Sequence, residues 1–159
     1  MTRPALLTRL GAFFAALGAS ASPRPASATD PAWNLTDAEW RARLSPAAFA
    51  VLRQHGTEYA GSSPLDHEKR NGIYDCAGCD LPLFSSKTKY DSGTGWPSFY
   101  DHLPHAIGES PDNSMFEPRT EVHCSRCGGH LGHVFDDGPR PTGLRYCMNG
   151  VALSFKPET

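Results

Sequence analysis

Two cysteine pairs, CAGC (Cys76 and Cys79) and CSRC (Cys124 and Cys127), constrain this chain more than any other feature. Two cysteines three positions apart on a tight turn can point both sulfurs at one metal ion, and two such turns complete a tetrahedral thiolate site. The two pairs are separated by 44 residues, so the fold must bring distant parts of the chain together. We therefore predict one structural zinc ion, bound by all four cysteines.

Two other uses of these cysteines stay open at this stage. Two disulfides would suit an oxidising compartment, and the chain would then be a disulfide-stapled secreted binding domain. However, a disulfide within a CxxC motif closes a very small ring and restrains little chain entropy. Redox-active CxxC motifs are the other alternative, although neither pair precedes a helix-like segment. Metal content separates these readings from the zinc site.

Residues 1–28 have the pattern of a secretory signal peptide. Two arginines and no acidic residue precede an apolar run, and small residues follow in ASA, which ends at Ala28. The apolar run is too short to span a bilayer as a helix, so we expect no stable membrane insertion. We expect export, to a periplasm, with cleavage after Ala28 or Ala21; an organelle transit peptide is the alternative.

Residues 29–159 are predicted to form a single domain. Residues 1–28 hold three arginines and no acidic residue, so their removal changes the net charge from -2 to -5. This charge is not the basic footprint of a nucleic-acid-binding protein, and we expect no nucleic-acid partner. The 15 glycines and 14 prolines favour short strands and turns over long helices.

The local patterns predict a mainly β fold preceded by short helices. Thr36 and Glu39 have the spacing of a capping box, and Ser45 with Pro46 marks the start of a second helix that Gly56 should end. Short runs rich in aromatic and β-branched residues then alternate with turns. The last run, VALSF at 151–155, alternates as a half-buried antiparallel strand does.

Cys147 is the one cysteine outside the two pairs. It lies in a predicted strand, RYCMN, where alternation puts Arg145 and Asn149 on its own face. A guanidinium nearby favours the thiolate, which is the nucleophilic form of cysteine. A buried structural cysteine is the plainer interpretation, and position alone does not separate the two.

Two further motifs, taken together, favour a nucleophilic Cys147 over a structural one. GGHLGHVFDDGP holds His130, His133 and Asp137, and DSGTGWPSF places Trp96 in a glycine-rich loop. With GLRYCMNGVALSF and the two CxxC pairs, these stretches resemble the methionine sulfoxide reductases of the B type. The resemblance covers almost the whole chain from Thr36 to Phe155.

The resemblance implies two antiparallel sheets, a zinc ion away from the active site, and thiol-dependent reduction of methionine-R-sulfoxide, free or in proteins. It implies that Cys147 is the nucleophile and that Trp96 binds the substrate methyl group. It implies that His130, His133 and Asn149 provide acid–base catalysis and contacts with the sulfoxide oxygen, and that Arg145 and Asp137 support them. The reaction would leave a sulfenic acid on Cys147.

The chain departs from the family pattern at one position. Many members carry a second cysteine in the loop before the tryptophan, which attacks the sulfenic acid; here that position is Thr94. We therefore expect the sulfenic acid to be reduced directly by an external thiol, such as a thioredoxin-like donor. Separately, we expect the protein to be a monomer. The competing function is a non-catalytic, zinc-ribbon-like binding module, which explains the CxxC pairs but not Cys147 with the histidines and Trp96.

Overall fold

The structure is a computed structural model, and it describes residues 30–159. The expected signal peptide, residues 1–28, lies outside the described residues. Within residues 30–159, no helix is long and apolar enough to cross a membrane.

Two short helices precede the β structure, as predicted. After the short 3-10 helix η1 (Pro31–Trp33), α1 (Asp37–Arg43) begins with a complete capping box between Thr36 and Glu39. The helix α2 (Pro46–Gln54) begins at the Ser45 cap, with Pro46 in its first position. The apolar face of both helices is buried, with Trp40, Phe49 and Leu52 each at most 2% exposed.

One helix boundary differs from the prediction. We expected Gly56 to end the second helix, but α2 ends at Gln54, and His55 takes the left-handed conformation with φ of 54°. The Gly56 amide then donates to the Ala50 carbonyl at 2.9 Å. Histidine adopts this region less readily than glycine. The His55 side chain contacts Glu121, with Nδ1 3.2 Å from Oε1.

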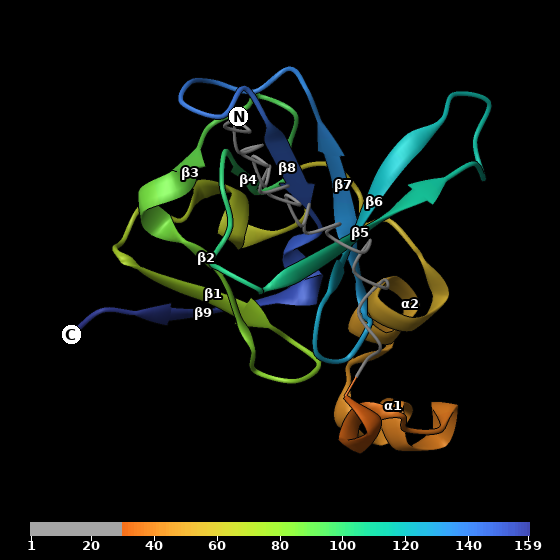
Figure 1. Cartoon of the computed structure of the whole chain (residues 1–159). Coiled ribbons are helices and arrows are strands. Elements are labelled where there is room, and N and C mark those ends of the chain that lie inside the picture. The colour runs from red at the N-terminus through yellow and green to blue at the C-terminus, as the bar shows by residue number, and fades with distance from the viewer. Residues whose placement is uncertain (1–29) are drawn as a thin grey trace, which may run out of the picture.

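Across residues 30–159, nine strands form two antiparallel sheets, which confirms the predicted fold class (Figure 1). The small sheet has the order β2-β1-β9 and the large sheet the order β3-β4-β8-β7-β6-β5. The strands are β1 (Gly72–Cys76), β2 (Pro82–Ser85), β3 (Lys89–Tyr90), β4 (Ser98–Phe99), β5 (Ile107–Asp112), β6 (Arg119–Cys124), β7 (His130–Phe135), β8 (Arg145–Met148) and β9 (Leu153–Pro157). Further 3-10 turns are η2 (Pro64–His67), η3 (Ser86–Thr88) and η4 (Gly150–Ala152).

The final strand is shorter than its alternating pattern indicated. Val151 belongs to η4, and β9 begins only at Leu153. The chain turns here because the carboxylate of Glu58 accepts hydrogen bonds from the amides of Gly150 and Val151, which removes them from any strand ladder. Glu58 therefore bonds to residues that lie 92 and 93 positions further along the sequence.

Aromatic side chains fill the space between the two sheets. Phe84 of the small sheet stacks on Phe99 of the large sheet, with ring centroids 4.4 Å apart, and Tyr74 meets the edge of Phe99 at 5.0 Å. All three residues are fully buried. Because this core covers one face of the large sheet, its opposite face is left for polar side chains.

Candidate active site and metal centre

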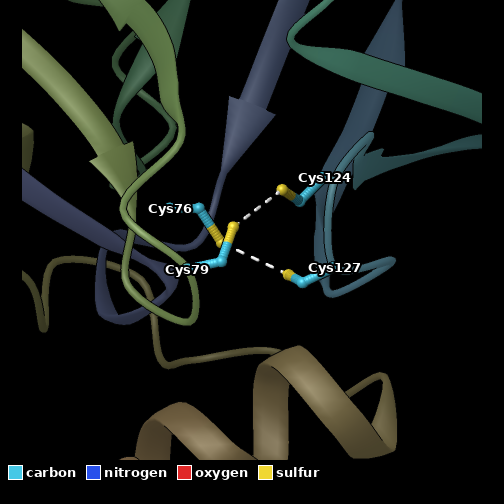
Figure 2. A group of neighbouring side chains, drawn as sticks. All are labelled: Cys76, Cys79, Cys124 and Cys127. Atoms are coloured by element: carbon cyan, nitrogen blue, oxygen red, sulfur yellow. Dashed lines mark hydrogen bonds between the residues drawn. The ribbon is translucent and has the colours of Figure 1, made fainter. Parts of the chain in front are cut away.

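The four paired cysteines lie together on two facing turns (Figure 2). Cys76 is the last residue of β1 and Cys79 lies in the turn that follows it. Cys124 is the last residue of β6 and Cys127 lies in the turn that follows it. All four are buried. Arg53 and Arg126 hold the turns in place by donating to the carbonyls of Cys127 and Cys79, each at 3.0 Å.

The spacing of the four sulfurs fits one tetrahedral zinc ion. Cys76 Sγ lies 3.7 Å from Cys127 Sγ, and Cys79 Sγ lies 3.5 Å from Cys124 Sγ. All four sulfurs lie within 4.8 Å of one another. A tetrahedron with Zn–S bonds of about 2.3 Å has edges of about 3.8 Å, whereas a disulfide needs about 2.05 Å. All five cysteines of residues 30–159 are free thiols, so the arrangement suits a metal ion and not the two disulfides.

A second group of polar residues forms a row across the outer face of the large sheet. Cys147 of β8 is paired with Ser98 of β4 on one side and with His133 of β7 on the other. His133 is in turn paired with Glu121 of β6, and Glu121 with Ser110 of β5. Directly paired residues point to the same face of a sheet. The fold therefore brings the predicted nucleophile and one predicted acid–base residue together.

Cys147 is half-buried, and its surroundings act on the thiol in opposite directions. Burial raises the pKa of Cys147 above its ordinary value, while the Thr94 hydroxyl, the Arg145 guanidinium and the Ser98 hydroxyl oppose that rise. Thr94 Oγ1 lies 4.0 Å from the sulfur. A thiol in this setting ionises only partly near neutral pH and depends on its neighbours to do so.

Arg145 is fixed by a two-point ion pair with Asp137. Its Nε and Nη2 donate to the two carboxylate oxygens at 2.7 and 2.9 Å, and its guanidinium lies over the Phe135 ring at 4.3 Å. The hydrogen bonds from Arg145 lower the pKa of Asp137 and raise that of Arg145. Asp137 thus positions the cation that favours the Cys147 thiolate.

Trp96 and Asn149 are held by a residue that the sequence analysis missed, Glu58. The Glu58 carbonyl accepts from Trp96 Nε1 at 3.2 Å, and its amide donates to Asn149 Oδ1 at 2.9 Å. Its carboxylate also holds the turn after β8. The Asn149 amide group donates to the Leu131 carbonyl, so in this structure both ends of that side chain are used by the backbone. A contact between Asn149 and the sulfoxide stays a prediction.

Both predicted histidines are bonded to carboxylates that were not predicted. His133 Nε2 lies 2.7 Å from Asp112 Oδ2, which also accepts from Arg119 at 2.8 Å. His130 Nδ1 lies 2.8 Å from Glu121 Oε1, and the two imidazole rings meet edge to face at 5.3 Å. Carboxylates bonded in this way select the tautomer and orientation of a histidine.

The burial of His130 determines its charge. Burial lowers the pKa of His130, and the hydrogen bond with Glu121 offsets only part of that effect. Burial also opposes ionisation of Glu121, but the hydrogen bonds from His130 and Ser110 outweigh it and lower the Glu121 pKa. A neutral imidazole beside a carboxylate donates through Nδ1, so Nε2 of His130 carries a lone pair. That atom has no hydrogen-bond partner among the residues that the structure describes.

The chain is similar to proteins of one family. The SelR domain family matches residues 44–157. A peptide methionine sulfoxide reductase MsrB of Agrobacterium fabrum is 50% identical over 130 residues, which cover 81% of this chain and 96% of the relative. The MsrB of Thiobacillus denitrificans is 56% identical over 124 residues, which cover 77% of this chain and 94% of the relative. The chloroplastic peptide methionine sulfoxide reductase B1 of Arabidopsis thaliana is 48% identical over 139 residues, 84% of this chain and 69% of the relative.

Proposed function

The chain belongs to the methionine sulfoxide reductase B family, and we propose that it reduces methionine-R-sulfoxide with Cys147 as the nucleophile. It is an oxidoreductase, and oxidised methionine is its substrate class. The observation that supports the proposed site best is the polar row on the large sheet, in which Cys147 lies between Ser98 and His133. The non-catalytic binding module offers no reason for that row.

In the proposed reaction, the Cys147 thiolate accepts the sulfoxide oxygen. The substrate sulfur is reduced to the thioether of methionine, and the cysteine sulfur is oxidised to a sulfenic acid, so one thiol and one sulfoxide give one sulfenic acid and one thioether. The sulfoxide oxygen needs a proton as the S–O bond breaks. His133, on the same sheet face as Cys147, supplies it, and Asp112 orients the imidazole through its contact with Nε2.

The remaining predicted residues position the two reactants. The half-buried Trp96 indole provides an apolar wall for the substrate methyl group, and Glu58 fixes that wall through the indole N–H. Arg145, fixed by Asp137, favours the thiolate before the reaction. His130 packs edge to face on His133, with ring centroids 5.3 Å apart, and so helps to position the proton donor. Its Nε2 is buried, so a contact between His130 and the sulfoxide oxygen stays a prediction.

Recycling of the enzyme is proposed to need an external thiol. Thr94 occupies the position next to the Cys147 sulfur, and its hydroxyl cannot form a disulfide. The other four cysteines are taken up by the predicted zinc site. Two equivalents of an external thiol, or one dithiol donor protein, reduce the sulfenic acid to the thiol and release water.

The zinc ion is proposed to be structural. When bound, it cross-links the β1–β2 turn to the β6–β7 turn and so joins the small sheet to the large one. The four thiolates leave no free coordination position for substrate. The four zinc-binding cysteines would therefore stabilise the fold and take no direct part in the reaction; they are Cys76, Cys79, Cys124 and Cys127.

The experiment that tests the proposed function measures turnover on the separate R and S epimers of a methionine sulfoxide peptide, with dithiothreitol as reductant. We expect reduction of the R epimer alone, and loss of turnover in Cys147→Ser. A full complement of zinc in that variant shows that the fold is retained. If the zinc-loaded wild-type protein turns over neither epimer, the chain is the non-catalytic module instead.

A further inference from the structure

Three further metal-ligand side chains, none of them a cysteine, converge where α2 ends. They are His55, Glu121 and His130, and their donor atoms all lie within 4.8 Å of one another. His55 Nδ1 lies 3.2 Å from Glu121 Oε1, and His130 Nδ1 lies 2.8 Å from the same oxygen. The two imidazole ring centroids are 5.1 Å apart. The proposed reaction makes no use of His55.

The cluster is held in place before any ligand arrives. Ser110 donates to Glu121 Oε2 at 2.8 Å, which leaves Oε1 facing both histidines. The His130 side chain is only 3% exposed, so packing restricts its ring. His55 holds its position through the left-handed backbone at the end of α2, which packs on the turn between β6 and β7 through Arg53 and Cys127.

An ion can reach this cluster from solvent. The His55 side chain is 66% exposed, and the three residues line a cavity of about 250 Å³ that also contains His133 and Asp112. Arg119 lines the same cavity, but Asp112 neutralises it through an ion pair at 2.8 Å. Glu121 therefore provides an uncompensated negative charge for a cation.

The donor set determines which ions fit. Two imidazole nitrogens and one carboxylate oxygen suit zinc and the divalent transition metals of similar preference, whereas calcium and magnesium prefer all-oxygen sites. Three protein ligands leave a fourth position open for water or another ligand. We propose that His55, Glu121 and His130 bind one divalent transition-metal ion, such as Zn²⁺, and that its binding slows the reductase.

Binding of this ion is expected to be reversible and to act through His130. Coordination at Nδ1 moves the ring proton to Nε2, which is buried without a partner in the part of the chain that the structure describes. The free energy needed to bury this N–H without a hydrogen bond limits the affinity of the site for the metal ion. The same change separates His130 from Glu121 and shifts the imidazole ring that packs on His133, so the acid–base arrangement of the site is lost. This second half of the proposal rests on the proposed function; metal binding does not.

The first experiment measures metal binding alone. Purified Cys147→Ser protein, with its cysteine-bound zinc retained, is titrated with Zn²⁺ against a chromogenic zinc chelator; the substitution removes the one thiol that could compete as a ligand. We expect one additional Zn²⁺ per chain. His55→Gly, introduced in the same background, should weaken the binding of this additional Zn²⁺ at least about 10-fold. Loss of a residue that only supports a metal ligand already lowers metal affinity by about that factor, so loss of a ligand should cost no less.

His105→Gly is the matched control. His105 is also exposed and also has a left-handed backbone, with φ of 59° against 54° for His55, so glycine fits both positions. It does not belong to the cluster. We expect His105→Gly to bind the additional Zn²⁺ as the parent does. Absence of an additional equivalent, or equal losses in the two variants, overturns the proposed site.

The second experiment measures inhibition in protein with Cys147 intact. Reduced enzyme is given one equivalent of the R sulfoxide without added thiol, because thiol reductants chelate zinc, and methionine formation is followed with and without Zn²⁺. The rate with Zn²⁺ divided by the rate without it should fall below one for the wild type and for His105→Gly. The same quotient should stay near one for His55→Gly. Binding without any change in this ratio overturns the regulatory half, whereas an inactive wild type overturns the proposed function and leaves the binding test intact.

Discussion

Each polar residue at the site is bonded to a partner that limits what it can do. Asp137 holds Arg145, Asp112 holds His133 and Glu121 holds His130, all at 2.7 to 2.9 Å. Of these partners, only Asp137 was predicted. The others are ordinary acidic residues in the sequence, and they become recognisable only because the register of β5, β6 and β7 brings them to the histidines.

At this scale, His133→Ala should slow reduction of the R sulfoxide by about 10²- to 10⁴-fold, the usual contribution of general acid–base catalysis. His67→Ala, which alters an exposed histidine of η2, should leave the rate unchanged. Single-turnover methionine formation measures both. A near-normal rate in His133→Ala would assign the proton donor to another group, with His130 as the first alternative.

The pH dependence should report the Cys147 thiol. Burial raises the pKa of this group, and the thiolate is the reactive form, so kcat/KM should increase with pH up to values above the ordinary pKa of a cysteine. Arg145 opposes the rise. Arg145→Met should therefore move this limb of the profile to still higher pH. A limb that does not move on Arg145→Met would contradict the role given to this cation.

Elements, more than single residues, decide where the reactive groups lie. The starts of α1 and α2 were predicted correctly because capping is local: the donor and acceptor are three residues apart in the sequence. The end of α2 and the start of β9 were predicted less well. His55 and Val151 are placed by contacts with β6 and with Glu58, which no local pattern contains.

The segment between α2 and η2 is predicted to act through Glu58. Glu58→Gln keeps the shape but loses the carboxylate that accepts from Gly150 and Val151. We expect the turn after β8 to loosen and kcat/KM to fall by about 10-fold or more, the scale on which a misplaced catalytic group costs rate. Glu117→Gln, on the exposed β5–β6 loop, is the control. Equal activity of the two variants would mean that the Glu58 clamp is not needed for catalysis.

The loop before β4 places Thr94 beside Cys147. Because Thr94 Oγ1 is already 4.0 Å from Cys147 Sγ, Thr94→Cys should form a disulfide with Cys147 after one turnover. The variant should then be reduced by thioredoxin more efficiently than the wild type, whereas Thr88→Cys in η3 should not. Mass spectrometry of peptides after one equivalent of sulfoxide detects the bond. Its absence in Thr94→Cys would show that the loop does not supply a resolving position.

At the scale of the whole molecule, the two sheets meet through an aromatic core and through the four cysteines. The mainly β class and the cysteine cluster were predictable because strand periodicity and CxxC spacing are strong local signals. The division into two sheets was predicted only from the family resemblance. Which strand lies beside which was not, since the order β4-β8-β7-β6 depends on long-range packing. Export of the protein stays a prediction from residues 1–28, to be checked by mass spectrometry of the N-terminus of the mature protein.

Loss of zinc should destabilise the whole domain. Structural zinc contributes roughly 10 kcal/mol or more in small zinc domains, comparable with the roughly 5–15 kcal/mol that stabilises a typical domain. Cys124→Ser should therefore lose the metal and unfold at a lower temperature, whereas Ser125→Ala beside it should keep one zinc per chain. Calorimetry with elemental analysis measures both effects. Active, stable protein without metal would reject the zinc site.

The most direct test of the account follows the oxygen atom through a single turnover. Reduced wild-type enzyme is mixed with one equivalent of R sulfoxide without external thiol, and dimedone is then added to trap sulfenic acid. We expect one methionine per chain, labelling of Cys147 in matching yield, and four cysteines still bound to zinc. Loss of two thiols with little labelling would instead show that a zinc-site cysteine resolves the sulfenic acid, which contradicts the proposed separation of the metal centre from the reaction.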